Sequence, residues 1–273
     1  MKVVLFCGGL GTRLREYSET TPKPLVPIGD RPMIWHLMKY YAHYGHTDFI
    51  LCLGYQGVMI KEYFMQYKEW ASNDFRMHGN GREIELFNTD LDDWRITFVD
   101  TGGTSNIGER LQVVRPFVKN EEMFLANYSD GLSDFPLEEQ LRAFGDSNAM
   151  VSFAAVRPPQ SFHSIRSDAQ GYVTEIRDAA SWDLWINGGF FIMRPGVFDY
   201  MQPGEDLVGR PFTRLASDRR LLSHTHHGFW ACMDTFKDKK MFDARHENDD
   251  RPWEVWNRAP VERAARLDVV ARA

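Results

Sequence analysis

The sequence predicts an α/β fold of three layers, in which helices cover both faces of a mostly parallel, mixed sheet. Short apolar runs alternate up to Val156 with segments in which apolar residues recur every three or four positions. Such alternation is typical of parallel sheets, because each parallel connection needs a crossover, which is usually a helix. The chain has 273 residues, of which 43% are hydrophobic, and this is enough for a sizeable core in one large domain or two small ones.

The elements nearest the N-terminus have the clearest patterns. Residues 3–6 form an apolar run that predicts a buried strand. We then expect a helix that begins at Pro32, carries apolar residues at i, i+3, i+4 and i+7, and ends at Gly45. Residues 49–53 predict a second strand, and residues 58–67 predict a second helix.

A polar stretch over residues 71–93 interrupts the alternation and predicts an excursion or flap. The pattern then resumes with strands expected at residues 95–99, 123–127 and 150–156, and helices at residues 107–115 and 137–144. Past Val156 the connections lengthen, and we expect strands at residues 172–176, 189–193 and 221–227 and a helix at residues 212–220. No linker divides the chain, so we expect one domain over residues 1–256 and a peripheral helix over residues 257–273.

The composition excludes several classes of protein. The chain carries 32 lysines and arginines against 38 acidic residues, a formal charge of −6, so we expect no binding to nucleic acid. No apolar run is long enough to cross a membrane, and the first apolar run meets Gly8 too early for a secretory signal. The three cysteines are widely spaced in apolar contexts, which is typical of reduced thiols. We therefore expect a cytoplasmic protein.

A glycine-rich segment follows the first strand directly and is a candidate phosphate-binding loop, because its backbone N–H groups can turn toward a phosphate chain. The segment reads G-G-L-G-T-R-L from Gly8. It lacks the third glycine of a dinucleotide-binding fingerprint, which disfavours a NAD-dependent dehydrogenase, and the G-K-[ST] of a Walker loop. Lys23 follows within T-P-K-P-L, where the two prolines restrict the backbone and hold the ammonium in place.

The phrase G-G-x-G-T-R-L followed by P-K-P resembles the signature of the sugar-1-phosphate nucleotidyltransferases. Later phrases, such as I-N-G-G-F-F and M-D-T, are similar to the glucose-1-phosphate cytidylyltransferases, and the resemblance extends from Met1 to Trp256. It implies a Rossmann-like fold and transfer of CMP from CTP to a sugar 1-phosphate, with glucose 1-phosphate as the leading acceptor and a CDP-sugar and pyrophosphate as products. In that family the glycine loop and its arginine hold the triphosphate, and the lysine stabilises the α-phosphate under attack. The resemblance assigns these roles to Gly8, Gly9, Gly11, Thr12, Arg13 and Lys23.

Two carboxylates are candidates for a magnesium site. Attack on a nucleotide phosphate needs charge neutralised on the triphosphate and on the incoming phosphate. Asp130 follows an expected strand in N-Y-S-D-G, and Asp234 lies far away in M-D-T. Two carboxylates with waters and phosphate oxygens suit Mg²⁺, which rarely takes an all-protein cage. Arg110 is expected either to reach the phosphates or the base, or to be a solvent-facing helix cation.

The family pattern breaks on the acceptor side. The family phrase E-K-P, whose lysine binds the phosphate of the incoming sugar phosphate, is missing where the chain reads E-I-R-D-A-A from Glu175. Arg177 is the candidate replacement, since arginine suits bidentate phosphate contact, and His163 stands where the family usually has glycine. The phrase I-N-G-G adds Asn187 and Gly188 as expected substrate-binding residues.

The altered acceptor side keeps alternatives open. One is a nucleotidylyltransferase that acts on a different phosphorylated alcohol or on a phosphonate. Another is a non-catalytic nucleotide-binding regulatory subunit, which the retention of the family's arginine, lysine and two aspartates disfavours. We also expect a homo-oligomer. Tryptophans such as Trp253 and Trp256 suit packing at the sheet edge or a subunit contact better than a stacking platform for a ligand.

Overall fold

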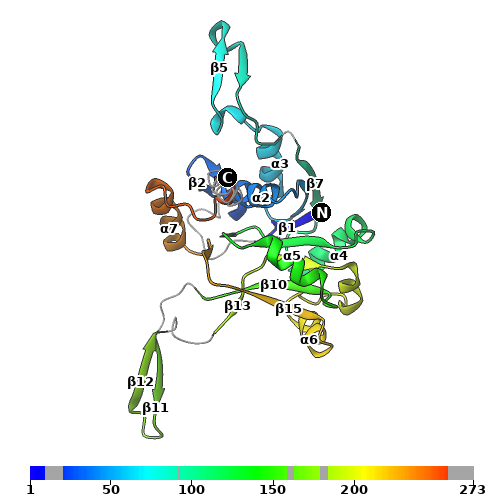
Figure 1. Cartoon of the computed structure of the whole chain (residues 1–273), viewed down its shortest axis with the longest axis vertical. Helices are drawn as coiled ribbons and strands as arrows, with labels where there is room; N and C mark the ends of the chain where they lie inside the picture. The colour runs from blue at the N-terminus through cyan, green and yellow to red at the C-terminus, as the bar shows by residue number, and fades with distance from the viewer. Residues whose placement is uncertain (10–20, 92, 159–162, 179–183, 258–273) are drawn as a thin grey trace, which may run out of the picture.

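The computed structural model describes the chain except for residues 10–20, 92, 159–162, 179–183 and 258–273 (Figure 1). Its centre is an eight-stranded sheet. The strands are β1 (Lys2–Phe6), β4 (Asp48–Leu53), β7 (Arg95–Asp100), β8 (Phe124–Tyr128), β10 (Val151–Val156), β13 (Ile186–Asn187), β14 (Phe191–Met193) and β15 (Leu221–His226). Their order is β13-β10-β14-β8-β1-β4-β7, and β15 joins the sheet by pairing with β10.

Most neighbours in this sheet run parallel. β1 pairs in parallel with β4 and β8, and β4 pairs in parallel with β7. β10 and β15 are also parallel. β14 runs antiparallel between β8 and β10, and β13 runs antiparallel to β10. The expected mixed, mostly parallel sheet is confirmed.

Helices cover both faces of the sheet. They are α2 (Met33–His43), α3 (Gly57–Met65), α4 (Ile107–Val118), α5 (Leu137–Gly145), α6 (Arg210–Ser217) and α7 (Phe236–Glu247). Val3 and Leu5 of β1 belong to one buried cluster with side chains of α2, α5 and α7. Val4 and Phe6, which point to the opposite face, belong to a second cluster with α4 and α6. The two clusters on either side of one sheet make the three expected layers.

Two hairpins project from the body at opposite ends of the molecule (Figure 1). The polar excursion contains β5 (Phe75–His78) and β6 (Glu83–Leu86), and the second hairpin joins β11 (His163–Ser167) to β12 (Val173–Asp178). Each has an apolar face, with Met77 opposite Ile84 in one and Ile165 opposite Ile176 in the other. The strand expected at residues 172–176 thus pairs with β11 and not with the central sheet, because a strand pattern does not specify its partner.

Several shorter elements differ from the sequence-based expectations. β2 (Pro27–Ile28) and β3 (Arg31–Pro32) form a small hairpin, so Pro32 ends a strand and caps α2, which begins at Met33. Helix α7 is not foreseen, because its apolar residues do not line one face. It begins instead with a capping box, in which Thr235 accepts from the backbone N–H of Asp238 and Asp238 accepts from that of Thr235.

The described part of the chain ends at the short helix η6 (Val255–Asn257), so the tail helix expected over residues 257–273 lies almost entirely outside the described residues. Trp253 is only 1% exposed and contacts the rings of Phe229 and Phe242, as core packing requires. Among the described helices, none has both the length and the apolar character that a membrane crossing needs.

Candidate active site

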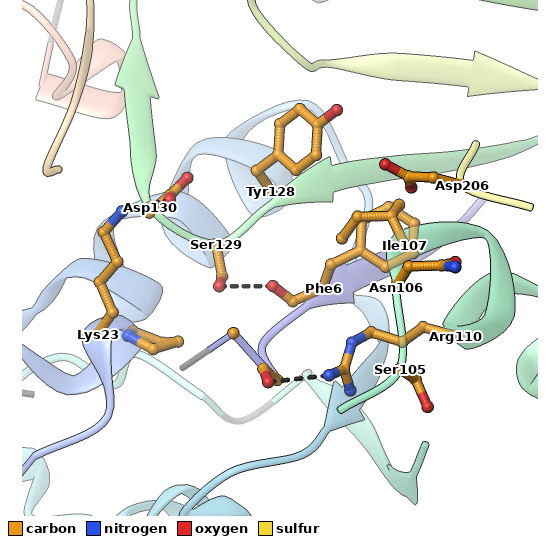
Figure 2. A pocket seen from close by; sticks show the side chains of 13 residues that line it. Phe6, Lys23, Ser105, Asn106, Ile107, Arg110, Tyr128, Ser129, Asp130 and Asp206 are labelled. Atoms are coloured by element: carbon orange, nitrogen blue, oxygen red, sulfur yellow. Dashed lines mark hydrogen bonds and ion pairs between the residues drawn. The ribbon is translucent and has the colours of Figure 1, made fainter. Parts of the chain in front are cut away.

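The candidate site lies where β1 and β8 end. These strands are parallel neighbours, so the loops that leave their carboxyl ends meet at one edge of the sheet. Gly8 and Gly9 follow β1, whereas Ser129 and Asp130 follow β8. Together with Lys23 and the start of α4 they line a pocket of about 260 Å³ (Figure 2).

Lys23 contacts two carboxylates from distant parts of the chain. It begins the short helix η1 (Lys23–Leu25), after Pro22 in an extended conformation. Its ammonium nitrogen lies 2.6 Å from Asp130 Oδ2 and 2.5 Å from Asp234 Oδ1. Burial disfavours the charged amine, but the two carboxylates outweigh that effect and raise the pKa of Lys23. Lys23 therefore remains an ammonium ion between two anionic groups.

A small two-stranded sheet brings the two aspartates together. β9 (Gly131–Ser133) follows Asp130 and pairs antiparallel with β16 (Trp230–Cys232), which precedes Asp234. Cys232 is the register partner of Gly131, and the N–H of Met233 donates to the carbonyl of Asp130 at 2.8 Å. The pairing explains why residues so far apart in sequence share one ammonium group.

Arg110 holds the start of the glycine loop through a buried hydrogen bond. Its side chain on α4 is buried, and its guanidinium donates to the carbonyl of Gly8 at 2.9 Å (Figure 2). It also donates to the carbonyl of Leu53 at 3.1 Å and to Thr101 Oγ1 at 2.7 Å, so one cation joins the ends of β1, β4 and β7. Burial lowers the pKa of this guanidinium, which nevertheless stays protonated. The alternative of a solvent-facing helix cation is wrong.

The two described glycines of the loop differ in their surroundings. A Cβ added to Gly8 would lie 2.0 Å from Arg110 Nη1, whereas a Cβ on Gly9 would meet nothing within 4 Å. Gly8 is therefore required by the packing beneath the loop, and Gly9 faces the open side. Gly11, Thr12 and Arg13 lie outside the described residues.

Residues 2–232 match the sequence profile of the family described as nucleotidyl transferase. The chain belongs to this family. The glucose-1-phosphate cytidylyltransferase of Salmonella typhi is 37% identical over 258 residues, which is 94% of this chain and 100% of that protein. The probable glucose-1-phosphate cytidylyltransferase of Bacillus subtilis (strain 168) is 34% identical over 258 residues, which is again 94% of this chain and 100% of that protein. The predicted family and the predicted similarity to the glucose-1-phosphate cytidylyltransferases are confirmed.

Solved structures of other nucleotidyltransferases have the same fold. A UDP-glucose pyrophosphorylase complexed with UDP-glucose superposes with a TM-score of 0.67 at 14% identity, covering 91% of this chain and 98% of that chain. A putative glucose-1-phosphate thymidylyltransferase from Bacillus anthracis superposes with a TM-score of 0.66 at 17% identity, covering 91% and 96%. These similarities confirm the Rossmann-like fold class.

Of the two residues expected to bind substrate in I-N-G-G, Asn187 contacts a residue that lines the pocket. Asn187 Nδ2 donates to the hydroxyl of Tyr128, a pocket-lining residue, at 3.1 Å. Gly188 accepts a hydrogen bond from Trp230 Nε1 at 2.8 Å, and a Cβ there would lie 2.8 Å from Val156. Asn187 therefore contacts the end of β8, whereas Gly188 lies against Val156 of β10 and Trp230 of β16.

Arg177 and His163 are placed elsewhere by the structure. Both belong to the hairpin of β11 and β12, which projects from the body (Figure 1). The Arg177 side chain is 58% exposed and forms an ion pair with Glu175 on its own strand. Arg177 does not line the pocket, and the role of Arg177 and His163 toward an acceptor phosphate stays a prediction.

Several pocket-lining residues were not foreseen. Tyr128 and Ser129 precede Asp130 directly, and their place at a strand end was a usable signal. Asn106 lies at the start of α4, where N-x-x-E marks a capping box that the structure forms with Glu109. Asp206 comes from a long connection and had no signal in the sequence.

Proposed function

We propose that this protein transfers CMP from CTP to a sugar 1-phosphate, with glucose 1-phosphate as the leading acceptor, and forms a CDP-sugar and pyrophosphate. The observation that carries the proposal is the convergence of Lys23, Asp130 and Asp234 beside the glycine loop. The 37% and 34% identical relatives, which align over their full length, support the choice of substrates.

The chemistry requires positioning and charge stabilisation more than covalent help. A phosphate oxygen of the acceptor attacks the α-phosphorus, the bond to the β-phosphate oxygen breaks, and pyrophosphate leaves with the electron pair. We propose that Lys23 stabilises the negative charge that develops on the α-phosphate, because its ammonium group is held at the edge of the pocket. We assign the backbone N–H groups of Gly8 and Gly9, which line the pocket, to the triphosphate, and the family resemblance adds Gly11, Thr12 and Arg13 to that role.

We assign Asp130 and Asp234 to Mg²⁺. Their carboxylate oxygens, which come from two distant segments, already lie beside one cation, the ammonium of Lys23. Within the described residues, no cluster of three or more histidines, cysteines and acidic residues is arranged to hold a metal ion. Such a two-carboxylate donor set fits a metal that keeps waters and takes phosphate oxygens as its other ligands. When bound, the metal would neutralise charge on the triphosphate. Lys23 is then free to exchange a carboxylate for a substrate phosphate.

The remaining assignments concern the loop and the acceptor. Arg110 keeps Gly8 in place and adds a buried positive charge beneath the nucleotide. Asn187 and Gly188 are proposed to contact the sugar, since Asn187 hydrogen-bonds to the pocket-lining Tyr128 and Gly188 follows it directly. Arg177 and His163 are proposed to bind the acceptor phosphate. Because they lie on a projecting hairpin, contact with the phosphate requires either movement of the hairpin or its docking on a second copy.

We further propose a cytoplasmic homo-oligomer whose transferase domain spans residues 1–256. The apolar faces of both hairpins are open to solvent in one chain, with Met77 58%, Ile165 61% and Ile176 64% exposed. An isolated two-stranded hairpin is only marginally stable, and the two hairpins lie at opposite ends and so cannot cover each other. Light scattering tests this, since Ile176→Asp should lower the mass in solution if a second copy covers that face.

Pyrophosphate release tests the function. CTP and Mg²⁺ are mixed with the protein and, in turn, with glucose 1-phosphate, other sugar 1-phosphates, phosphorylated alcohols and phosphonates. Release with glucose 1-phosphate alone supports the leading acceptor, and release with another compound supports the alternative acceptor class. No release with any acceptor, despite CTP binding, would favour the regulatory subunit.

A further inference from the structure

Asp206 lines the nucleotide pocket at the end that faces away from the reacting groups. Figure 2 shows Lys23 and Asp130 on one side of the pocket and Asp206 on the other, beside Asn106 and Ile107. The proposed function uses the first group of residues and assigns no role to Asp206. An acid on the wall of a pocket for a triphosphate calls for a physical explanation.

The segment that carries Asp206 is braced from three directions. Asn106 Nδ2 donates to the carbonyl of Gly204 at 3.1 Å. The carbonyl of Glu205 lies so close to α4 that a Cβ on Gly108 would be 2.1 Å from it. The Glu205 carboxylate accepts two hydrogen bonds from Arg214, at 2.6 and 2.5 Å. Asp206 is thus presented by a rigid segment packed on the first turn of α4.

The carboxylate of Asp206 retains an acceptor for a ligand. Oδ1 accepts from the N–H of Leu207 at 2.9 Å, and Leu207 is fully buried. Within the described residues no lysine, arginine or histidine forms an ion pair with Asp206, whereas Asp130 contacts Lys23. A carboxylate oxygen accepts hydrogen bonds and does not donate them, so this part of the pocket favours a ligand group that donates.

The charge of Asp206 decides which half of the nucleotide it meets. A carboxylate beside a triphosphate would be repelled by it, whereas the ammonium of Lys23, which is proposed to meet the phosphates, lies on the opposite side of the pocket (Figure 2). The wall near Asp206 is partly apolar, with Ile107 and the ring of Tyr128, as a nucleoside requires. The donors of a cytosine nucleoside are the 4-amino group and the ribose hydroxyls.

We propose that Asp206 selects the nucleoside by accepting a hydrogen bond from one of these donors, an inference that rests on the proposed function for the choice of CTP. If the donor is the 4-amino group, Asp206 discriminates against uracil, which places an acceptor oxygen at that position. If the donor is a ribose hydroxyl, Asp206 discriminates against a deoxynucleotide. Either form of discrimination needs only the second carboxylate oxygen of Asp206, which the braced segment holds at the edge of the pocket.

Calorimetry of nucleotide binding tests the proposal without turnover. CTP, UTP and 2′-deoxy-CTP are titrated in the presence of Mg²⁺ into the wild-type protein, into Asp206→Asn and into the control Asp199→Asn. Asparagine keeps the acceptor for the Leu207 N–H but replaces the second oxygen with a donor. Asp199 is an exposed acid on the same connection that does not line the pocket.

The expected result is a selective loss. Asp206→Asn should reduce the preference for CTP over UTP, or for CTP over 2′-deoxy-CTP, at least about tenfold, since hydrogen bonds to charged groups are the stronger ones. The first pattern identifies the amino group and the second a hydroxyl, while Asp199→Asn leaves both ratios unchanged. A purely structural role would weaken all three nucleotides equally, and unchanged ratios in Asp206→Asn would overturn the inference.

Two further measurements keep the result interpretable. If Asp206→Asn does not fold, Asp206→Ser retains a short acceptor for Leu207 and is titrated in its place, with the same outcomes. Pyrophosphate release by the wild-type protein is measured in parallel. If Asp206→Asn changes the binding ratios but the wild-type protein releases no pyrophosphate, only the proposed function is contradicted. If the wild-type protein releases pyrophosphate but Asp206→Asn leaves the binding ratios unchanged, only the inference is contradicted.

Discussion

The residues proposed to bind the nucleotide and those proposed to bind the acceptor are positioned in different ways. On the nucleotide side, Gly8, Lys23 and Asp130 come from loops at the ends of adjacent strands, and the sheet order brings them together. Arg177, which is proposed to bind the acceptor, lies on a hairpin outside the central sheet, where it is exposed and forms an ion pair with Glu175 of its own strand. A parallel sheet fixes the positions of its carboxyl-end loops within one chain, whereas a projecting hairpin gains a fixed position only from what it contacts.

The largest expected effect comes from removing the cation on the nucleotide side. Lys23→Ala deletes a preorganised charged donor, which should cost on the order of 3 kcal/mol, or roughly a hundredfold in kcat. The loss leaves Asp130 and Asp234 without their shared cation, so kcat is measured at saturating Mg²⁺ to offset the repulsion. The exposed Lys119 at the end of α4 provides the control Lys119→Ala. Turnover of Lys23→Ala within about threefold of wild type would exclude the assignment.

The next effect concerns the two aspartates. Asparagine at Asp130 or Asp234 keeps the size of the side chain and removes its charge, so the Mg²⁺ concentration for half-maximal kcat should rise. Loss of an outer-shell partner typically costs about 10–100-fold in metal affinity, so loss of a direct ligand should cost at least about tenfold. The exposed Asp146 after α5 supplies a control in Asp146→Asn. A Mg²⁺ titration that does not shift, or a CTP complex without metal density at either carboxylate, would refute the site.

A smaller effect should separate the two described glycines of the loop. In Gly8→Ala the new methyl group would displace the Arg110 guanidinium and break its hydrogen bonds, which should cost about 2 kcal/mol of unfolding free energy. Gly9→Ala meets no atom within 4 Å and should change that free energy by less than about 0.5 kcal/mol. Chemical denaturation measures both. Equal stability of the two variants would show that Arg110 does not require the glycine.

The sequence predicts those parts of the site that follow long strands, and it does not predict those that depend on short strands or on burial. Strand and helix patterns located the ends of β1 and β8, so the sequence alone was enough to place Gly8 and Asp130 at one edge of the sheet. The pairing of β9 with β16, which joins Asp130 to Asp234, depends on strands of three residues that carry no pattern of their own. Arg110 was ambiguous, because a cation on a helix shows its burial only when the ends of neighbouring strands are in place.

The smallest effect tests the acceptor side. Arg177→Ala should raise the KM for the acceptor about tenfold, the effect of losing one charge-assisted hydrogen bond, and leave the KM for CTP unchanged. Burial of a phosphate without a positive partner is costly, and the missing family lysine leaves Arg177 as the nearest candidate in sequence. Arg166→Ala is the matched control, since Arg166 lies on the same hairpin and is 80% exposed. If Arg177 acts from a second copy, mixing Arg177→Ala with inactive Lys23→Ala should restore acceptor affinity in mixed assemblies. Equal changes in both KM values, or none, would mean that another cation binds the acceptor phosphate.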